Sequence, residues 1–318
     1  MLFFQNVSVS TTSNHPLQPT KRAYYWSGIL MVFGAAFCFA LKGIFIKLAY
    51  QEQVDTISIL ALRMVFALPV YVLIAFHLSR QPNAVAFDGR SLTLVAGLGI
   101  LGYYVSSYLD FYSLNYISAS MERVLLFVYP TFVLLINFLF RKKQITSLQL
   151  LALLLTYVGI LITFVENIDS SQQKNLFLGA FFVVFSGFTF AFYLVGSDSV
   201  ITRFGSEKFT TFAMIAATVP TLLHCWFANG FDLFRFSPKV YFIGLTMAFV
   251  STIIPTFMLA EGIKRVGSAN ASIAGSIGPI FTIVLATLFL GETISLLQIM
   301  GTMLVLLGVF LIGWKGKK

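Results

Sequence analysis

Charged residues are scarce in this sequence, and that scarcity decides the class of protein. Only 10% of the chain is Asp, Glu, Lys or Arg, while 58% is hydrophobic. Soluble domains carry about 25% charged and roughly 45–50% apolar residues, so the composition excludes a soluble fold. Aromatic residues reach 16%, which also excludes a disordered chain, because such chains lack the apolar surface needed to form a core.

Cysteine and histidine are also rare. Cys38 and Cys225 both lie inside apolar runs, where a thiol packs as a small hydrophobe, so no disulfide scaffold is expected. The three histidines, at positions 15, 77 and 224, are too widely separated to form a metal site on neighbouring helical turns. No His-Glu-x-x-His, Cys-x-x-Cys or phosphate-loop motif occurs. We therefore expect no enzyme activity, no bound metal and no cofactor.

Long apolar runs make up most of the chain. Residues 1–25 are polar and lack the apolar core of a secretory signal, so they predict a cytoplasmic N-terminal tail. Each of the ten runs that follow is long enough to cross a hydrocarbon core of about 30 Å at about 1.5 Å per residue. The expected helices cover residues 26–50, 56–78, 91–114, 117–140, 146–166, 176–201, 209–228, 238–260, 268–290 and 295–314. The sequence thus predicts an all-α integral membrane protein in a lipid bilayer.

The basic residues indicate how these helices are oriented. The net charge is +9, but the Lys and Arg residues occur in twos and threes between apolar runs, without the continuous basic face of a nucleic-acid binder. Fourteen of the 21 fall on the tails and the alternate loops on the same side, and four fall on the opposite side. Because basic loops stay in the cytoplasm, we expect both termini to be cytoplasmic and the protein to span a bacterial inner membrane.

The strongest organisational signal is an internal repeat. At a shift of 149 residues, Pro130 aligns with Pro279 and Gly159 with Gly308; at a shift of 151, Pro69 aligns with Pro220, among other pairs. The repeat divides the chain into residues 26–166 and 176–314, with five expected helices in each half. Because five is odd, the second half must insert upside down, which gives the inverted repeats of alternating-access transporters.

These repeated motifs resemble the EamA branch of the drug/metabolite transporter superfamily. The most specific motifs are Gly267-Ser268-Ala269, Pro279, Leu290-Gly291-Glu292, Gln298, Gly301 and Gly308, with Tyr116-Ile117-Ser118-Ala119 and Tyr129-Pro130 in the first half. Where the family often has Gly-Glu after the fourth helix, this chain has Lys142-Lys143. The resemblance implies a secondary transporter with ten helices and a central cavity lined mainly by helices 1, 3, 4, 6, 8 and 9. Helices 5 and 10 would support the fold or form a homodimer.

Five charged residues lie within the expected helices, in one layer near the outer membrane boundary: Lys42, Arg63, Asp110, Glu122 and Arg123. Charges inside a bilayer are costly and commonly mark a pathway. Mutual pairing would neutralise four of them and leave one cation for a carboxylate or phosphate. The alternative is that all of them form structural ion pairs, with Arg123 extending towards water. Glu122 is the candidate for carrying a coupling proton.

A polar stripe on the sixth expected helix is the second candidate for substrate contact. Ser186, Thr189 and Tyr193 are spaced to share one helix face. The 151-residue shift places Tyr193 opposite Lys42. The alternative is that these hydroxyls bond to carbonyls of their own helix.

The fourth and ninth expected helices add further candidates. Tyr129 lies on the same face as Glu122, and Pro130 and Pro279 are candidate gate bends, because proline removes a helical hydrogen bond. We expect a carrier that exports a small metabolite or amphipathic compound. Uptake or exchange of an anionic metabolite is the alternative function, and a non-transporting receptor or scaffold is a third.

Overall fold

The computed structural model describes residues 21–80, 87–142, 144–168, 174–230 and 232–314, and these residues form helices and connecting turns without a strand. Residues 1–20 of the expected tail lie outside this range. The first part of the chain comprises α1 (Lys21–Gln51), α2 (Thr56–Ser79), α3 (Gly89–Gly99), η1 (Ile100–Val105), α4 (Ser106–Ser113), α5 (Ala119–Leu126), α6 (Tyr129–Arg141) and α7 (Ser147–Glu166). The remainder comprises α8 (Leu176–Phe204), α9 (Ser206–Asn229), α10 (Pro238–Ala248), η2 (Phe249–Ile253), α11 (Ile254–Ala274), η3 (Gly275–Ile277), α12 (Gly278–Leu290) and α13 (Leu296–Trp314).

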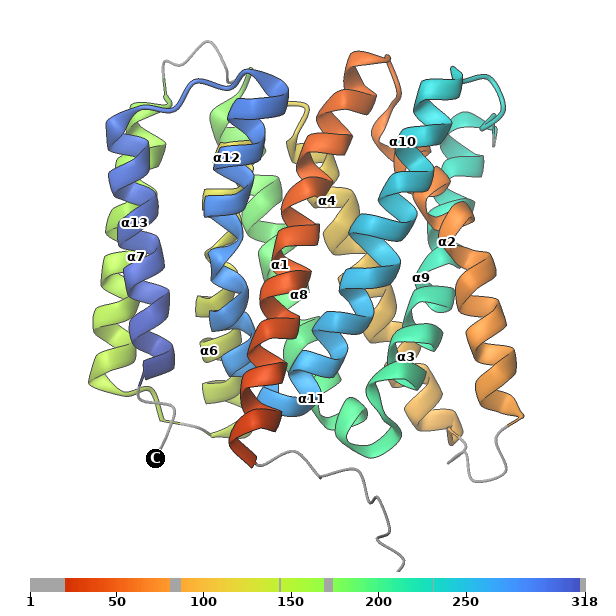
Figure 1. The fold of residues 1–318 in the computed structure, drawn as a ribbon, viewed down its shortest axis with the longest axis horizontal. Helices are drawn as coiled ribbons and strands as arrows, with labels where there is room; N and C mark the ends of the chain where they lie inside the picture. The colour runs from red at the N-terminus through yellow and green to blue at the C-terminus, as the bar shows by residue number, and fades with distance from the viewer. Residues whose placement is uncertain (1–20, 81–86, 143, 169–173, 231, 315–318) are drawn as a thin grey trace, which may run out of the picture.

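The helices run roughly parallel to one another, as those of a membrane bundle do (Figure 1). In the described residues, eight helical segments are long and apolar enough to cross a bilayer, and two shorter apolar helices, Gly278–Leu290 and Leu296–Gly308, follow them. Only helices satisfy all their backbone hydrogen bonds within a single spanning segment. The fold is therefore that of a multi-pass membrane protein, and the start of α1 and the end of α13 lie at the same end of the bundle.

Four helix interruptions occur at matched positions in the two parts of the chain. The π-helical segments η1 (Ile100–Val105) and η2 (Phe249–Ile253) begin 149 residues apart. The break between α5 and α6 is likewise matched by η3, because Pro130 and Pro279 each stand in the first turn of the following helix. Proline is tolerated in a first turn because its missing N–H would have no helical partner there. Pro130 and Pro279, the candidate gate bends of the sequence, thus each follow a break in the helix.

A fifth irregularity lies within α11, where Gly267 has φ 80° and ψ 159°. This left-handed φ strains any residue with a side chain and favours glycine. The chain changes direction here before it continues into the segment that contains Ser268 and Ala271. Gly267 thus marks the turn that the sequence analysis placed between the expected helices 238–260 and 268–290.

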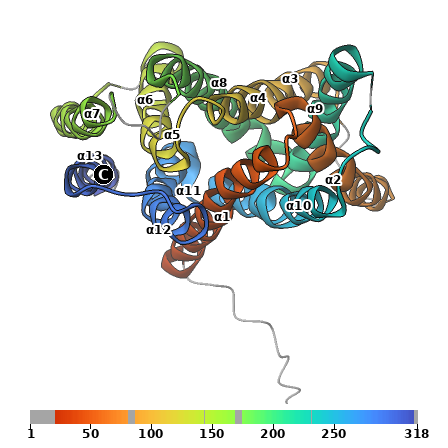
Figure 2. The same cartoon turned by 90° about the horizontal axis from the view of Figure 1, so that it is seen from above.

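The helices α7 and α13 form a pair at one side of the bundle (Figure 2). Their contact depends on small residues, since an added side chain at Gly159 would meet the backbone oxygen of Gly301. Thr163 stands in the same contact, and its hydroxyl donates to the carbonyl of Gly159 within α7. Small residues of this kind allow close approach of two helices in a membrane, where no hydrophobic force drives helix association.

Glu292 connects the second part of the chain to the first. Its carboxylate accepts hydrogen bonds from the backbone N–H groups of Ala119 and Ser120 at 2.8 and 3.0 Å, and from the Ser120 hydroxyl at 2.6 Å. These groups form the N-terminus of α5, where free N–H groups and the helix dipole favour an anion. The glutamate after Gly291 therefore caps a helix in the opposite half.

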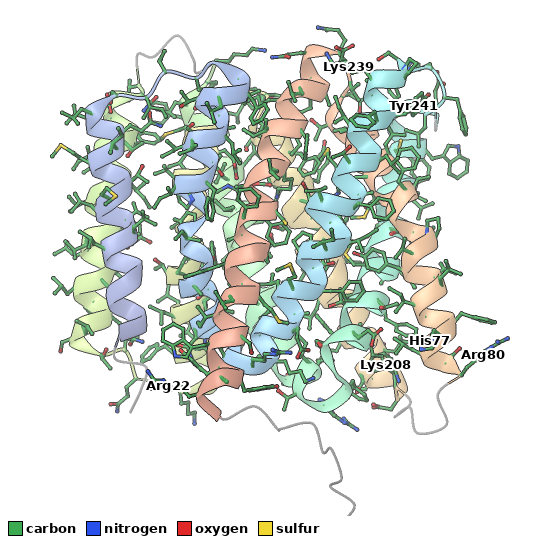
Figure 3. All side chains as sticks on the ribbon, in the orientation of Figure 1. Arg22, His77, Arg80, Lys208, Lys239 and Tyr241 are labelled. Carbon is green, nitrogen blue, oxygen red and sulfur yellow. The ribbon has the colours of Figure 1, made fainter. Side chains whose placement is uncertain are left out.

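Basic side chains gather at the end of the bundle where α1 begins. Arg22, Arg80 and Lys208 lie at that end, whereas Lys239 lies at the other (Figure 3). At the latter end Lys239 forms an ion pair of 2.6 Å with Glu52. The basic side chains that the sequence places on one side of the membrane, Arg22, Arg80 and Lys208 among them, therefore lie at one end of the bundle.

Candidate functional site

A cavity of about 100 Å³ lies at the centre of the bundle, among the interrupted helices. Its wall includes residues from η1, η2, η3 and the α5–α6 break, so all four matched interruptions border it. Apolar side chains form much of the wall, and polar groups from both parts of the chain project among them. The residues that line it are Val32, Ala35, Ala36, Phe39, Lys42, Arg63, Gly102, Tyr103, Ser106, Ser107, Asp110, Arg123, Leu126, Phe127, Tyr129, Ser186, Phe190, Leu194, Ser251, Thr252, Thr256, Leu259, Ala271, Ser272, Gly275 and Gly278.

Lys42 and Asp110 form an ion pair across this wall. The Lys42 Nζ atom of α1 lies 2.5 Å from Oδ2 of Asp110 on α4. Asp110 is almost completely buried, and its second oxygen, Oδ1, has no hydrogen-bond partner among the described residues. The pair neutralises two of the five charges.

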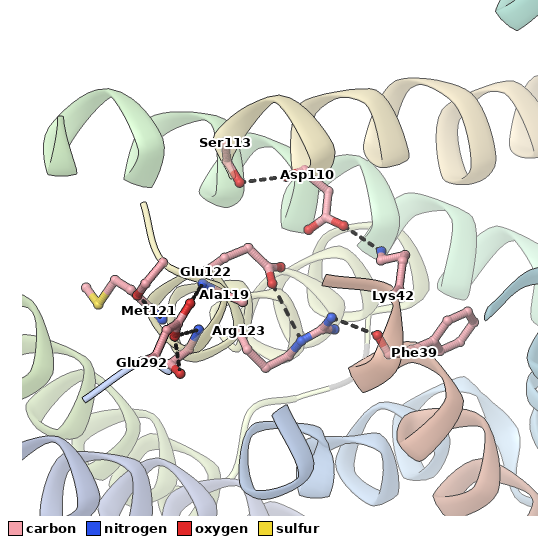
Figure 4. A network of polar contacts seen from close by, with 11 residues as sticks. Phe39, Lys42, Asp110, Ser113, Ala119, Met121, Glu122, Arg123 and Glu292 are labelled. Atoms are coloured by element: carbon pink, nitrogen blue, oxygen red, sulfur yellow. Dashed lines mark hydrogen bonds and ion pairs between the residues drawn. The ribbon is translucent and has the colours of Figure 1, made fainter. Parts of the chain in front are cut away.

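Glu122 and Arg123 form a looser second pair next to the first (Figure 4). The Arg123 Nε atom lies 3.6 Å from Glu122 Oε2, while Arg123 Nη2 donates a hydrogen bond of 2.9 Å to the backbone oxygen of Phe39. Glu122 is fully buried, and neither of its carboxyl oxygens has a hydrogen-bond partner among the described residues. Of these two residues, Arg123 lines the cavity and Glu122 lies behind it.

Arg63 is the remaining charge of the cluster and the one lining residue contributed by α2. Its guanidinium lies over the ring of Phe111, 4.9 Å from the ring centroid. The side chain is 3% exposed, and neither Nε nor Nη2 has a hydrogen-bond partner among the described residues. The Lys42 Nζ atom lies 5.6 Å from the centroid of the same ring, so Phe111 contacts two cations.

The polar stripe of α8 divides into one residue that lines the cavity and two that do not. The Ser186 hydroxyl lines it and donates a hydrogen bond of 2.9 Å to the backbone oxygen of Ser106. Thr189 instead bonds to the carbonyl of Ser186 in its own helix, as the alternative interpretation predicted. Tyr193 is fully buried, and its hydroxyl lies 2.6 Å from that of Tyr103, which does line the cavity.

Tyr129 is also placed at the cavity, at the start of α6. Its hydroxyl donates a hydrogen bond of 2.8 Å to the backbone oxygen of Ser272 on α11. This bond ties the break in the first part of the chain to the segment just before η3. Pro130 and Pro279 stand at the breaks themselves and do not belong to the lining residues.

Four hydroxyl-bearing residues of the second half line the cavity and were not predicted as site residues: Ser251, Thr252, Thr256 and Ser272. Ser251 is fully buried with its hydroxyl unpartnered among the described residues, while Thr252 and Thr256 bond to backbone oxygens of their own helix. A shift of 149 aligns Ser251 with Gly102 and Thr252 with Tyr103, which also line the cavity, but neither counterpart was a candidate from the sequence, so the repeat gave no signal.

A second, more open cavity of about 590 Å³ lies at the end of the bundle opposite the start of α1. Lys47 and Lys174 line it together with Asp55 and Glu292. Neither cavity contains a metal-binding arrangement, since the described residues include no group of three or more His, Cys, Asp or Glu side chains placed to hold an ion. The chemistry available at the central cavity is therefore ion pairing, hydrogen bonding and apolar contact.

Comparison with known proteins identifies the family. The EamA-like transporter family model matches residues 26–165 and again residues 177–314. The chain is 32% identical to the uncharacterized transporter YcbK of Bacillus subtilis (strain 168), over 86% of this chain and 89% of that protein. It is 24% identical to the uncharacterized transporter sll1319 of Synechocystis sp. (strain ATCC 27184 / PCC 6803 / Kazusa), over 91% of this chain and 93% of that protein.

A solved crystal structure has the same fold, with a TM-score of 0.68 over 92% of this chain and 98% of that chain, at 13% identity. The relatives are transporters by name, and the family model covers both parts of the chain. The central cavity contains buried charges inside a bundle that spans the membrane. The chain belongs to the EamA-like transporter family and is a multi-pass membrane transporter.

Proposed function

We propose that this protein is a secondary active transporter that carries a small metabolite by alternating access through the central cavity. In this proposal, ten spanning helices form two inverted repeats, residues 26–166 and 176–314, with both termini in the cytoplasm. The membrane is the bacterial inner membrane. The proposed direction is export.

The observation that carries the proposal is the matched arrangement of the four helix interruptions around the cavity. The segments η1 and η2 lie at equivalent positions of the repeat, as do the α5–α6 break and η3. Inverted-repeat transporters place their binding sites near the midplane, where discontinuous helices from the two halves meet. Each interruption in the first part of the chain has an equivalent in the second, so the bundle can bend at equivalent places in both parts. Alternating access uses equivalent bends of this kind.

The charge of the cavity favours uptake or exchange of an anionic metabolite as a second candidate function. The cluster contains Lys42, Arg63 and Arg123 against Asp110 and Glu122, so it has one positive charge in excess when all five are ionised. A proton is the candidate coupling ion in either direction. Glu122 is the candidate carrier, because its carboxyl is buried and lies between Arg123 and Asp110 (Figure 4).

Counterflow in proteoliposomes tests the proposal. Liposomes preloaded with one unlabelled metabolite from a panel should transiently accumulate the same labelled metabolite above its equilibrium level. Ala36→Trp should abolish this accumulation, because Ala36 lines the cavity and an indole would fill a space of about 100 Å³. Leu30→Trp is the matched control, since Leu30 lies on the same helix with 66% of its surface exposed.

Retained counterflow in a folded Ala36→Trp protein would contradict transport through this cavity. Failure of the wild-type protein to exchange any compound that it binds would contradict transport itself and support a receptor or scaffold. The proposed protein partner is a second copy of the chain, which would dock on the α7–α13 side of the bundle.

A further inference from the structure

One cation at the cavity, Arg63, has no ion-pair partner among the residues that the structure describes. Lys42 is paired with Asp110 at 2.5 Å, and Arg123 is paired with Glu122 at 3.6 Å and hydrogen-bonded to Phe39. Arg63 forms no comparable contact with any residue that the structure describes. The ion pairing expected from the sequence therefore leaves a surplus cation, and the structure identifies it as Arg63.

The burial of Arg63 makes the missing partner costly. A guanidinium presents five N–H donors and does not lose its proton in a protein, and a buried charge without hydrogen bonds loses several kcal/mol of solvation free energy. Contact with the Phe111 ring at 4.9 Å recovers part of this loss through a cation–π interaction. It leaves the donors Nε and Nη2 unused, although almost all buried donors in folded proteins have partners.

The polar groups nearest to Arg63 are already engaged elsewhere. Tyr71, Tyr103 and Asp110 lie close enough to interact with it electrostatically. The Tyr71 hydroxyl is 2.9 Å from that of Thr256, the Tyr103 hydroxyl is 2.6 Å from that of Tyr193, and Asp110 is paired with Lys42. Each of these three side chains has a partner, although Asp110 Oδ1 does not, and Arg63 Nε and Nη2 stay without a hydrogen bond among the described residues, at the wall of the cavity that Arg63 lines.

The planar guanidinium fits a carboxylate, with two parallel N–H···O bonds. The rest of the wall suits an apolar body, since Phe39, Leu126, Phe127 and Phe190 line it. The volume of about 100 Å³ is smaller than the ~150 Å³ of an apolar cavity that binds benzene. The cavity therefore accepts a short carboxylic acid without rearrangement, and a larger one only when it widens.

We infer that Arg63 is the anion-binding group of the cavity, and that the transported metabolite is a small monocarboxylate whose carboxylate pairs with the Arg63 guanidinium while its apolar part lies against the aromatic wall. This inference rests on the proposed function. It adds a substrate class and assigns the binding of the anion to one residue.

Thermal unfolding of the purified protein in nanodiscs, followed by tryptophan fluorescence, measures binding without transport. The probes are straight-chain, branched and aromatic monocarboxylates of three to nine carbons, each compared with its primary amide. A ligand that binds only the folded protein raises the unfolding temperature. Acids should stabilise the wild-type protein and the matching amides should not, because an amide lacks the negative charge.

The Arg63→Gln variant should bind the stabilising acid about 10- to 100-fold more weakly, as expected for the loss of a charge-assisted pair. Arg63→Lys should fall between this variant and the wild type, since it keeps the charge and loses the planar fork. Arg80→Gln is the matched control, because Arg80 lies at the exposed end of the same helix over Phe76 and should bind as the wild type does.

Equal stabilisation by acids and amides, or no stabilisation by any acid, would overturn the inference, and both comparisons need only the wild-type protein. Unchanged affinity in Arg63→Gln would overturn it as well. Counterflow distinguishes this failure from that of the proposed function. If the protein exchanges a neutral compound, and Arg63→Gln exchanges it as the wild type does, the result contradicts the anion site and supports the transport function. If acids bind but no compound is exchanged, the result supports the anion site and contradicts the transport function.

Discussion

Lys42 and Asp110 lie 68 positions apart in the sequence, yet their side chains meet at 2.5 Å and join α1 to α4 at the wall of the central cavity. The 149- and 151-residue repeat shifts align Asp110 with Leu259 and Lys42 with Tyr193. The second half therefore has no copy of this pair. An ion pair that one half contains and the other lacks is not required by the repeated fold, so its position at the cavity favours a role in function.

Removing one member of this pair should destabilise the protein more than removing both. Lys42→Met or Asp110→Leu alone leaves a buried, uncompensated charge, which typically costs about 3–5 kcal/mol of unfolding free energy. The double variant replaces both charges with apolar groups and should recover most of that loss. Denaturation of the four proteins in micelles measures the coupling between the two sites.

The pair between Lys239 and Glu52 provides the control for this cycle, because the Lys239 side chain is 60% exposed. Its removal should cost less than about 1 kcal/mol. A double variant of Lys42 and Asp110 no more stable than the worse single variant would contradict a simple neutralising pair.

Glu122→Gln should separate proton coupling from exchange. If Glu122 carries the proton, the variant loses substrate accumulation driven by a pH gradient and keeps counterflow, because exchange requires no net proton movement. The measurement is accumulation and counterflow in the same proteoliposomes, with Asp110→Asn examined in parallel. Accumulation that is unchanged in both variants would eliminate proton coupling through these two acids.

Gly102→Ala should weaken substrate binding by displacing Tyr193. A Cβ atom at position 102 would lie 2.5–2.7 Å from three atoms of the Tyr193 side chain, too close for the ring to stay in place. The shift should break the 2.6 Å contact between the Tyr193 and Tyr103 hydroxyls at the cavity wall. We expect roughly tenfold weaker binding at a cost of about 1–3 kcal/mol in stability, measured by ligand-dependent thermal unfolding.

Gly97→Ala is the matched control in α3, since no atom lies within 4 Å of its added Cβ. Tyr193→Phe removes the same hydroxyl contact without a steric clash and should weaken binding in the same direction. Wild-type affinity in both Gly102→Ala and Tyr193→Phe would mean that Tyr193 contributes packing alone.

Single cysteines should establish the orientation of the bundle. In a background with Cys38 and Cys225 replaced by Ala, an impermeant thiol reagent outside intact cells should label Lys174→Cys and not Gln144→Cys. Both positions are exposed in the structure, so accessibility does not limit the reaction. Labelling of position 144 alone would reverse the topology.

Much of the membrane fold was predictable because its signal is local. A helix that crosses a bilayer needs about 20 consecutive apolar residues, and each such run is visible in the sequence. Pro130 and Pro279 were candidate bends for a local reason as well, since proline removes a helical hydrogen bond, and each stands just after a break. The π-helical segments at residues 100–105 and 249–253 contain no proline. They were not predicted because no particular residue type marks a π-helical turn in a sequence.

The sequence named six residues that line the cavity, Lys42, Arg63, Asp110, Arg123, Tyr129 and Ser186, but did not predict their contacts. The sequence identified five charged residues in one layer. It did not show which of them form ion pairs, because that depends on how the separate helices pack. Spacing placed Thr189 and Tyr193 on the same face as Ser186, yet Thr189 bonds to its own helix and Tyr193 to Tyr103. Helical periodicity defines a face and does not define which residue on that face reaches the cavity.

Two-sided labelling of Ser186→Cys tests alternating access most directly. Ser186 lines the cavity on α8 and is 1% exposed, whereas Ser199 on the same helix is exposed near its end. In membrane vesicles of opposite orientation and a cysteine-free background, the account predicts that an impermeant thiol reagent reaches Ser186→Cys from either face, with saturating substrate slowing both reactions. Ser199→Cys should react from the cytoplasmic face alone. Reaction of Ser186→Cys from one face only, with and without substrate, would contradict alternating access through this cavity.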